Sequence, residues 1–171
     1  MTHFLLVIRI QYQLLDVLMR TEKGSNWQSV KGFVPWKRIR ISSSRFGIGQ
    51  QNGSNQTPLG LHRIANKIGG GWPVGTVFRH RQMVGFTWKG LPSSPIVHRI
   101  LWLEGLEPGF NQGGNVDSHS RYIYIHCTSD EPGLSRPSSR GCIHVSAKEL
   151  LPLFDRIPSG SLVWIQVGLQ R

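Results

Sequence analysis

Residues 121–145 read RYIYIHCTSDEPGLSRPSSRGCIHV, and this stretch decides the fold class. Its first part is rich in β-branched and aromatic residues, a composition typical of a strand. Side chains alternate between the two faces of a strand, so Tyr122, Tyr124 and His126 are predicted to share one face. Cys127 is then predicted to point to the opposite face. A histidine displayed beside tyrosines at a strand end is a candidate functional group.

A second candidate group follows the loop after this strand. Sixteen residues after His126 comes Cys142, preceded by Gly141 and flanked at two residues' distance by Arg140 and His144. Neighbouring cations lower the pKa of a thiol, so at Cys142 we expect either a thiolate paired with His126 or a thiol whose proton His126 takes. Gly141 permits close approach of the backbone, and the amides of Gly141 and Cys142 could point at a developing oxyanion. The sequence therefore supplies the nucleophile, base and oxyanion donors of acyl transfer by cysteine.

Non-catalytic interpretations of these residues stay open. A histidine at a strand end is often a structural hydrogen-bonding group, and a free cysteine is often buried. A zinc site built from His126, Cys127, Cys142 and His144 is conceivable. Its spacing is not that of a zinc knuckle, however, and strand alternation separates the adjacent pair, so we predict no metal site. The same alternation disfavours a disulfide between Cys127 and Cys142.

Short strands joined by turns are expected along most of the chain. The 20 Gly and 10 Pro residues, with polar clusters between apolar runs, favour many turns. Strands are predicted where β-branched and aromatic residues stand between turn formers: two within 4–19, then 31–44, 76–78, 98–103, 121–127 and 161–167. Residues 45–60 indicate a long exposed loop. The spacing of apolar residues in 61–68 fits a helix and a strand equally poorly.

One short helix is predicted between the last two strands. Ser146, followed three residues later by Glu149, forms a capping-box pattern, and an apolar side follows it. Pro158 and Gly160 end the helix, while Pro152 inside it predicts a kink or a late start. With 171 residues and no internal repeat, the chain is expected to form a single, mostly β domain over residues 1–171.

The chain is strongly basic. Twenty Lys and Arg against nine Asp and Glu give a formal net charge of +11, which predicts a polyanionic partner or surroundings. The charges are scattered and no nucleic-acid module is present, so a diffusely basic surface is favoured over nucleic-acid binding. No window approaches the roughly 20 apolar residues of a membrane helix. The apolar run 4–8 lacks a preceding basic region and is interrupted by Arg9, so it predicts a strand and no signal peptide is visible.

The stretch from 122 to 165, YIYIHCTSDEPGLSRPSSRGCIHVSAKELLPLFDRIPSGSLVWI, resembles the catalytic core of the L,D-transpeptidases of the YkuD type. In that family a strand ending in His-Gly-Thr is followed by a loop and then by Ser-His-Gly-Cys-hydrophobic-Arg or Asn. The upstream segments SSSRFGIGQ, QTPLG and RILWLEGLEPG are similar to the family's earlier strand, its Thr-Pro-x-Gly turn and an insertion. The resemblance implies a β-sandwich of mixed sheets with a short helix near the site.

By this resemblance Cys142 corresponds to the nucleophile and His126 to the base. Gly141 with Cys142 occupies the oxyanion-hole segment, and Ser139 is the small residue that opens the motif. The residues expected to contact the substrate are Ser139, Arg140, His144, Tyr122 and Tyr124. The chain departs from the family pattern at three positions, with an arginine at 140, a histidine at 144 and a cysteine at 127 where glycine is usual.

The resemblance implies a reaction on peptidoglycan stem peptides. The cysteine would attack the third residue of a stem tetrapeptide, release D-alanine and pass the acyl group to an amine of a second stem. With water as acceptor, the same domain would be an L,D-carboxypeptidase or another murein peptide hydrolase. The resemblance implies no cofactor, a monomer, and a place in the cell envelope or periplasm.

Other protein classes compete with this interpretation. A non-catalytic basic domain that binds anionic envelope polymers would need neither thiol. Papain-like peptidases place their cysteine before the histidine, whereas here the histidine comes first. Sortases share the order His, Cys, Arg, but their histidine lies much further upstream.

Overall fold

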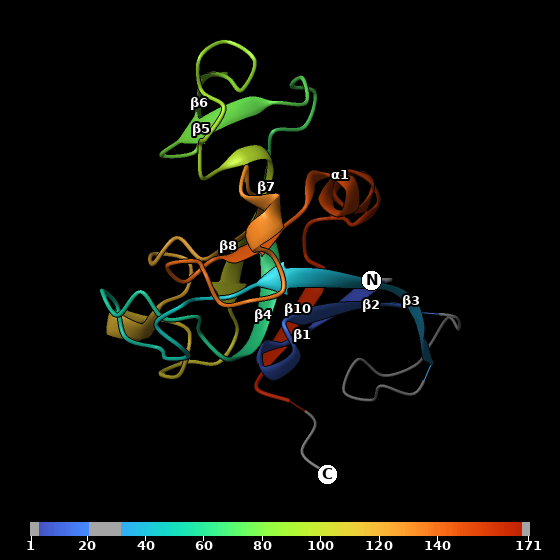
Figure 1. Ribbon diagram of the computed structural model, residues 1–171. Coiled ribbons are helices and arrows are strands. Elements are labelled where there is room, and N and C mark those ends of the chain that lie inside the picture. The colour runs from blue at the N-terminus through green and yellow to red at the C-terminus, as the bar shows by residue number, and fades with distance from the viewer. Residues whose placement is uncertain (1–3, 21–31, 169–171) are drawn as a thin grey trace.

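The computed structural model describes residues 4–20 and 32–168. These residues form ten strands, one α-helix and three short 3-10 turns (Figure 1). The strands are β1 Phe4–Arg9, β2 Leu14–Arg20, β3 Phe33–Ser42, β4 Gly60–Ile68, β5 Thr76–Arg79, β6 Gln82–Phe86, β7 Val97–Gly105, β8 Tyr124–Cys127, β9 Ile143–Val145 and β10 Leu162–Gln166. The helix α1 spans Ala147–Arg156, and the 3-10 turns span Ile10–Tyr12, Gly114–Val116 and Glu131–Gly133.

The strands form one mixed sheet that closes on itself. Its order is β4-β10-β1-β2-β3-β9-β8-β7, and β7 pairs back with β4. The pairs β1 with β10 and β8 with β9 are parallel. The hairpin β5–β6 is attached to β7 outside this ring and rises above it in Figure 1. The predicted mostly β fold with one helix is confirmed, and the predicted sandwich corresponds to the opposite walls of a barrel-like sheet.

Most predicted strands are present. The segment 4–19 forms β1 and β2 as expected, the undecided segment 61–68 lies in β4, and residues 45–59 contain no regular strand. Lys31, the first residue of the next predicted strand, lies outside the described residues. The strand predicted from Arg121 begins only at Tyr124, because Tyr122 lies in a turn, with a φ of 57° and its amide bonded to the His119 carbonyl. The strands β6 and β9 were not predicted.

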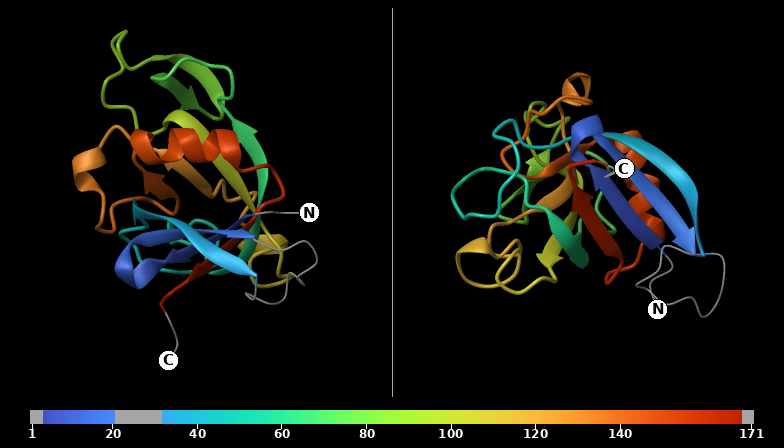
Figure 2. Two further views of the ribbon diagram at one scale, coloured as in Figure 1. Left: turned by 90° about the vertical axis from the view of Figure 1, so that its right-hand side faces the viewer. Right: turned by 90° about the horizontal axis from the view of Figure 1, so that it is seen from below.

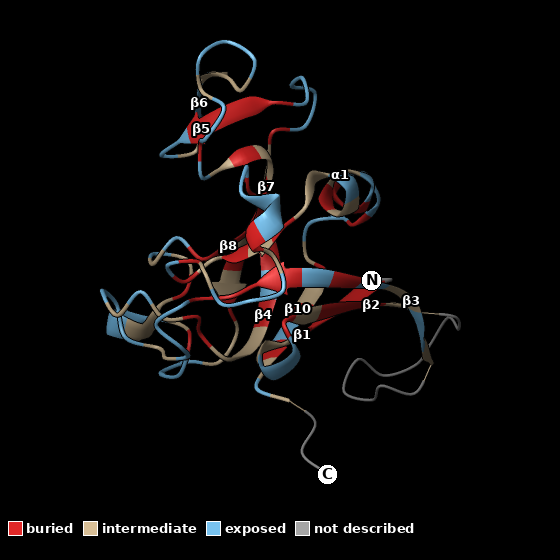
Figure 3. Ribbon diagram, viewed as in Figure 1, coloured by how far each residue is buried: buried red, intermediate tan, exposed pale blue. Residues whose placement is uncertain are grey.

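The inner side chains of the ring form one apolar core. Leu6 and Ile8 of β1, Ile41 of β3 and Ile125 of β8 are fully buried in it. Figure 3 shows the buried residues concentrated on the ring strands and on β5 of the outer hairpin, with the exposed ones mainly on the connecting loops. Removing a large aliphatic side chain from water contributes about 1.5–3 kcal/mol, so this core is the main stabilising feature of the fold.

The helix α1 packs along β7 and β8 (Figure 2). Its position and its N-cap residue Ser146 were predicted correctly, and Pro152 lies inside it. The predicted capping box is wrong, because the Ser146 side chain makes no capping hydrogen bond and Glu149 forms an ion pair with Lys37, at 2.5 Å. Instead, Glu131 of the preceding loop accepts a hydrogen bond from the Ala147 amide at 2.6 Å. The loop between β8 and β9 is thereby tied to the helix.

A buried histidine predicts how stability depends on pH. The His62 ring is fully buried between the Gly60 carbonyl, at 3.0 Å, and the Ser118 hydroxyl, at 2.9 Å. Burial lowers the pKa of His62 from 6.5 to about 4. The unfolded chain therefore binds this proton more readily between the two values. We expect the free energy of unfolding to fall by on the order of 3 kcal/mol from this group as the pH drops through that window.

Denaturant unfolding at pH 7.5 and pH 4.5, on the unmodified protein and on His62→Gln, measures this effect. The variant is expected to lose less stability on acidification, because its side chain does not titrate. Burial also lowers the pKa of His126, so part of the acid sensitivity is expected to remain. An identical loss in both proteins would contradict the prediction.

Candidate active site

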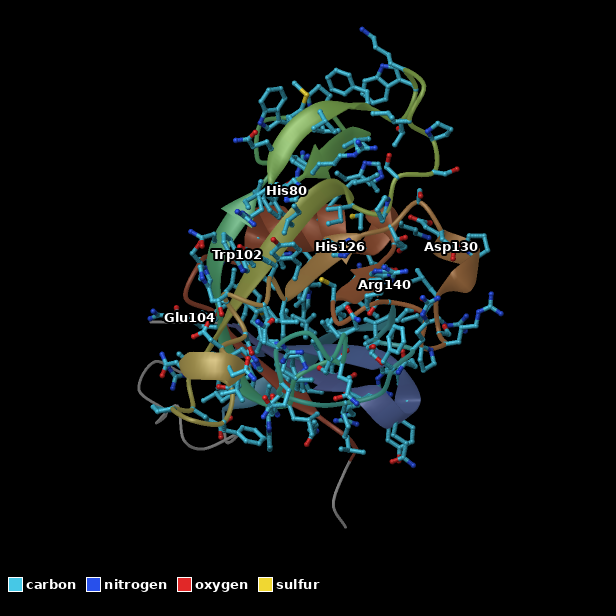
Figure 4. The ribbon with its side chains drawn as sticks, turned by 90° about the vertical axis from the view of Figure 1, so that its left-hand side faces the viewer. His80, Trp102, Glu104, His126, Asp130 and Arg140 are labelled. Carbon is cyan, nitrogen blue, oxygen red and sulfur yellow. The ribbon has the colours of Figure 1, made fainter. Side chains whose placement is uncertain are left out.

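The parallel pair β8 and β9 brings the predicted base and nucleophile together. His126 pairs with His144, and Cys142 directly precedes β9. Side-chain alternation then places Cys142 and His144 on the face that carries Tyr124 and His126. The contacts agree: the His126 and His144 rings lie 4.7 Å apart, and Cys142 packs against a cluster that contains Tyr124. Figure 4 shows His126 at the centre of this face.

The proton of His126 is fixed by a backbone carbonyl. Its Nδ1 lies 2.9 Å from the carbonyl oxygen of Cys127. A carbonyl only accepts hydrogen bonds, so Nδ1 carries the hydrogen and Nε2 keeps its lone pair. Burial, and to a lesser extent the charge of His144, lower the pKa of His126 to about 3. The imidazole is therefore neutral at physiological pH and able to accept a proton at Nε2.

The surroundings of Cys142 favour the neutral thiol. Burial raises its pKa to about 11, while the Tyr124 amide and the charge of Arg121 lower it by less. The thiol donates to the carbonyl oxygen of Tyr122 at 3.5 Å. A resting ion pair is disfavoured, because Arg140 is exposed to screening solvent and burial lowers the pKa of His144, which disfavours its charged form. The surroundings fit the other expected state, a thiol that would pass its proton to His126 in a reaction at this sulfur.

The turn before Cys142 is held by its own hydrogen bonds. The buried Ser139 hydroxyl donates to the Cys142 carbonyl oxygen at 2.6 Å and accepts the Gly141 amide at 3.2 Å. Thr57 donates to the Gly141 carbonyl oxygen at 3.0 Å. Gly141 has a φ of 117°, and a β-carbon there would lie 3.4 Å from the Gln56 carbonyl oxygen, which explains the glycine.

These bonds bear on two predicted roles. The Ser139 hydroxyl is engaged within the turn, which favours a positioning role over contact with the substrate. The Gly141 amide already has an acceptor in Ser139, so the Cys142 amide stays the predicted oxyanion donor.

The other predicted substrate contacts surround the cysteine unequally. Tyr124 is buried beside it, Tyr122 is 51% exposed, and His144 is half-buried next to His126. Arg140 is exposed on the loop that leads to the cysteine (Figure 4). All four therefore border the same face of β8 and β9, or the turn that enters it.

The two cysteines lie in different environments. Cys127 is fully buried in the main core, whereas Cys142 packs in a separate cluster with Phe78, Ile100 and Tyr124. Both are free thiols, and the predicted opposite facing of position 127 is confirmed. Within residues 4–20 and 32–168, no group of three or more His, Cys, Asp or Glu side chains is arranged to hold a metal. The zinc set considered from the sequence is therefore not assembled.

Arg121 is a site residue that the sequence analysis missed. Its half-buried guanidinium donates to the carbonyl oxygens of Gln50 and Gln56, both at 2.7 Å, and of Gly49, at 3.2 Å. Its charge opposes the effect of burial on the Cys142 thiol. The arginine thus ties the loop after β3 to the site and supplies a fixed positive charge. The sequence feature that could have identified Arg121 is its position directly before the segment that carries Tyr122 and Tyr124.

The charge of Arg121 can be tested on thiol reactivity. Arg121→Gln is expected to slow alkylation of Cys142 by iodoacetamide about three- to tenfold near pH 8, because the forming thiolate loses a nearby cation. Arg121→Lys should keep more of the rate, since it retains the charge. The measurement is the pH–rate profile of alkylation at Cys142, resolved by peptide mass. An unchanged pH–rate profile in Arg121→Gln would show that the charge of Arg121 does not affect the Cys142 thiol.

A family model described as the L,D-transpeptidase catalytic domain, YkuD, matches residues 21–165. The chain belongs to the YkuD family of L,D-transpeptidase catalytic domains. The match confirms the resemblance seen in the sequence. No curated protein matches this YkuD domain.

Solved structures share the fold of this YkuD domain. Bd1075 of Bdellovibrio bacteriovorus has a TM-score of 0.60 at 13% identity, covering 99% of this chain and 49% of its own. The helical cell shape determining protein Pgp2 of Campylobacter jejuni has a TM-score of 0.57 at 16% identity, with 99% and 48% covered. L,D-transpeptidase 3 of Mycobacterium tuberculosis, in complex with a faropenem-derived adduct, has a TM-score of 0.50 at 15% identity, with 96% and 60% covered. This YkuD domain therefore spans about half to three fifths of these chains.

Proposed function

We propose that this YkuD domain is a peptidoglycan L,D-transpeptidase, a cysteine acyltransferase that cross-links stem peptides. Cys142 attacks the third residue of a stem tetrapeptide, releases D-alanine and transfers the acyl group to an amine of a second stem. One observation carries the proposal: Cys142 and His126 share one face of adjacent parallel strands, and the Cys127 carbonyl leaves Nε2 of the base without a proton. The family match supports the reaction class.

The reaction proceeds through a thioester. Nε2 of His126 takes the thiol proton as sulfur forms a bond to the substrate carbonyl carbon, and the Cys142 amide donates to the oxyanion. Collapse of this intermediate breaks the carbon–nitrogen bond, and the proton on Nε2 passes to the nitrogen of the departing D-alanine. The acceptor amine then attacks the thioester and gives its proton to His126. The acyl group leaves on the acceptor, the proton returns to sulfur, and the neutral pair is restored.

The charge of the chain fits an anionic setting. A net charge of +11 would raise the local concentration of stems rich in carboxylates, and would also favour anionic envelope polymers. We propose the cell envelope or periplasm as the place of action, a monomeric domain and no nucleic-acid partner. Among the described residues, the structure has no helix with the length and apolarity of a membrane span.

The test is turnover of a defined tetrapeptide stem by the purified protein, with released D-alanine and cross-linked product both quantified. A transpeptidase is expected to release one D-alanine for each cross-link. Release of D-alanine without cross-links would instead support the L,D-carboxypeptidase alternative. Absence of both products would overturn acyl transfer and favour a basic domain that binds envelope polymer, whose binding would survive loss of the thiol.

A further inference from the structure

An arginine outside the catalytic pair is held in an aromatic cage. The guanidinium carbon of Arg81 lies 4.7 Å from the ring centroid of Trp102 and 4.7 Å from that of Tyr122. One of its terminal nitrogens donates to the Tyr124 hydroxyl at 3.3 Å. We call the three rings, Trp102, Tyr122 and Tyr124, the aromatic cage. Cation–π contacts of this kind are attractive, so the cage holds the guanidinium in place.

The backbone brings Arg81 to the cage through a tight turn. Arg81 and His80 form the two-residue connection between β5 and β6, with φ values of 68° and 48°. Positive φ at both positions is the conformation of the hairpin turn that matches strand twist. Such a conformation is strained for residues other than glycine, yet it places Arg81 over the rings. Figure 4 shows His80 and Trp102 on the same side of the molecule as His126.

The cage adjoins the nucleophile. Trp102 and Cys142 both pack against the cluster that contains Tyr124, and the Cys142 thiol donates to the Tyr122 carbonyl oxygen at 3.5 Å. Trp102 is itself anchored, because its ring stacks on His119 at 3.9 Å. Its indole N–H also donates to the His119 carbonyl oxygen at 3.1 Å. A rigid, positively charged surface therefore borders the place where the substrate carbonyl must lie.

The charge of Arg81 has no acidic partner among the described residues. The four ion pairs there use Asp16, Glu104 and Glu149, and Arg81 takes part in none of them. A guanidinium has five N–H donors, and the hydroxyls of Tyr124 and Tyr122 engage only some of them. The side chain is partly exposed, so its remaining donors can reach a ligand.

We propose that Arg81 binds a carboxylate of the acyl donor, an inference that rests on the proposed function. The guanidinium carbon lies over two neighbouring rings, and N–H groups that the rings leave free can match a carboxylate through two parallel hydrogen bonds. The carboxylate nearest the bond that Cys142 breaks belongs to the leaving D-residue, and we assign Arg81 to it. Internal carboxylates of the stem offer the same chemistry and are separated from it by the experiment.

Binding to the Cys142→Ala protein tests this assignment without turnover. Calorimetry would compare a tetrapeptide stem that has a free terminal carboxylate with the same peptide amidated at its C-terminus. We expect the acid to bind about tenfold more tightly, because an Arg–carboxylate pair is lost in the amide. In Cys142→Ala with Arg81→Gln, the two peptides should bind equally and weakly. Arg81→Lys should show an intermediate preference, since it keeps the charge but not the planar fork.

Arg79→Gln provides the matched control. Arg79 is an exposed arginine of the same hairpin, and its charge lies outside the aromatic cage. This variant, in the Cys142→Ala background, should keep the preference for the acid. If Arg79→Gln and Arg81→Gln lose the preference for the acid equally, general surface charge explains that preference, and the proposed site is wrong.

A third peptide, amidated only at its internal carboxylates, separates the two sources. One outcome is that this peptide binds more weakly than the free acid and that the difference vanishes in Arg81→Gln. Such a result would place Arg81 on an internal carboxylate, which supports the binding site but changes the carboxylate assigned to it. No discrimination among the three peptides, or no binding of any, would overturn it. Failure of the proposed function looks different: the unmodified protein would release no D-alanine while the acid preference persisted.

Discussion

Cys142→Ala is expected to abolish covalent capture of faropenem and to lower turnover of a tetrapeptide stem at least about 10³-fold, because the variant has no sulfur to form the thioester. Intact mass after incubation with faropenem measures the first effect. Under the proposed function, the thiol would open the β-lactam ring and hold the opened ligand as a thioester. We expect a single adduct on the unmodified protein and none on the variant. An adduct that persists on Cys142→Ala would place the nucleophile elsewhere.

Cys127→Ala is the matched control for this experiment. Cys127 is the other thiol of the chain, and it is fully buried in the main core. Its loss should cost some stability through a small cavity but should leave the adduct at Cys142 intact. Circular dichroism of both variants would confirm that the fold is retained. Loss of the adduct in Cys127→Ala without unfolding would contradict the assignment.

His126→Gln is expected to slow acylation of Cys142 by about 10²- to 10⁴-fold near neutral pH. The reason is the protonation state of the sulfur, whose pKa burial raises to about 11. At pH 7 such a thiol is ionised in roughly one molecule in ten thousand, so the reaction depends on a base. The rate of adduct formation, followed by mass spectrometry, measures the loss.

The pH profile separates a base from a structural histidine. In His126→Gln the acylation rate should rise about tenfold for each pH unit up to the thiol pKa, because hydroxide must then remove the proton. The unmodified protein should show a flatter profile over the same range. His144→Gln is the comparison variant: its ring lies 4.7 Å from that of His126 on the same face, and it should keep the flatter profile even if the rate changes, because Nε2 of His126 remains. A His126→Gln protein as fast as the unmodified one would exclude the general base.

Much of the fold followed from local sequence patterns. The strands β1, β7 and β10 and the helix α1 are dense in apolar residues at the spacing of their structure, and turn formers bound them. The closing pair of β4 with β7 and the parallel pair of β1 with β10 could not be foreseen. Both pairs join segments that lie far apart in the chain, and the residue pattern of one strand does not determine which strand pairs with it. The three-residue β9 is too short to leave a pattern.

The residues of the candidate site can be proposed from the sequence, but their charge states cannot. The order of His126 and Cys142, and the glycine before the cysteine, are legible in the sequence. The thiol's protonation state is not, because it depends on burial and on which cations come close in space. Arg140 is two residues from the cysteine yet exposed, whereas Arg121 is twenty-one residues away and acts on its pKa. Arg81 reaches the site through a separate hairpin.

The oxygen that orients His126 belongs to a peptide bond. Every amino acid at position 127 would present the same oxygen, so a point substitution there changes the packing behind the imidazole without deleting its partner. The cysteine found at this position is therefore compatible with an intact tautomer. A hydrogen-bond partner that belongs to the main chain is lost to the imidazole only if the strand itself moves.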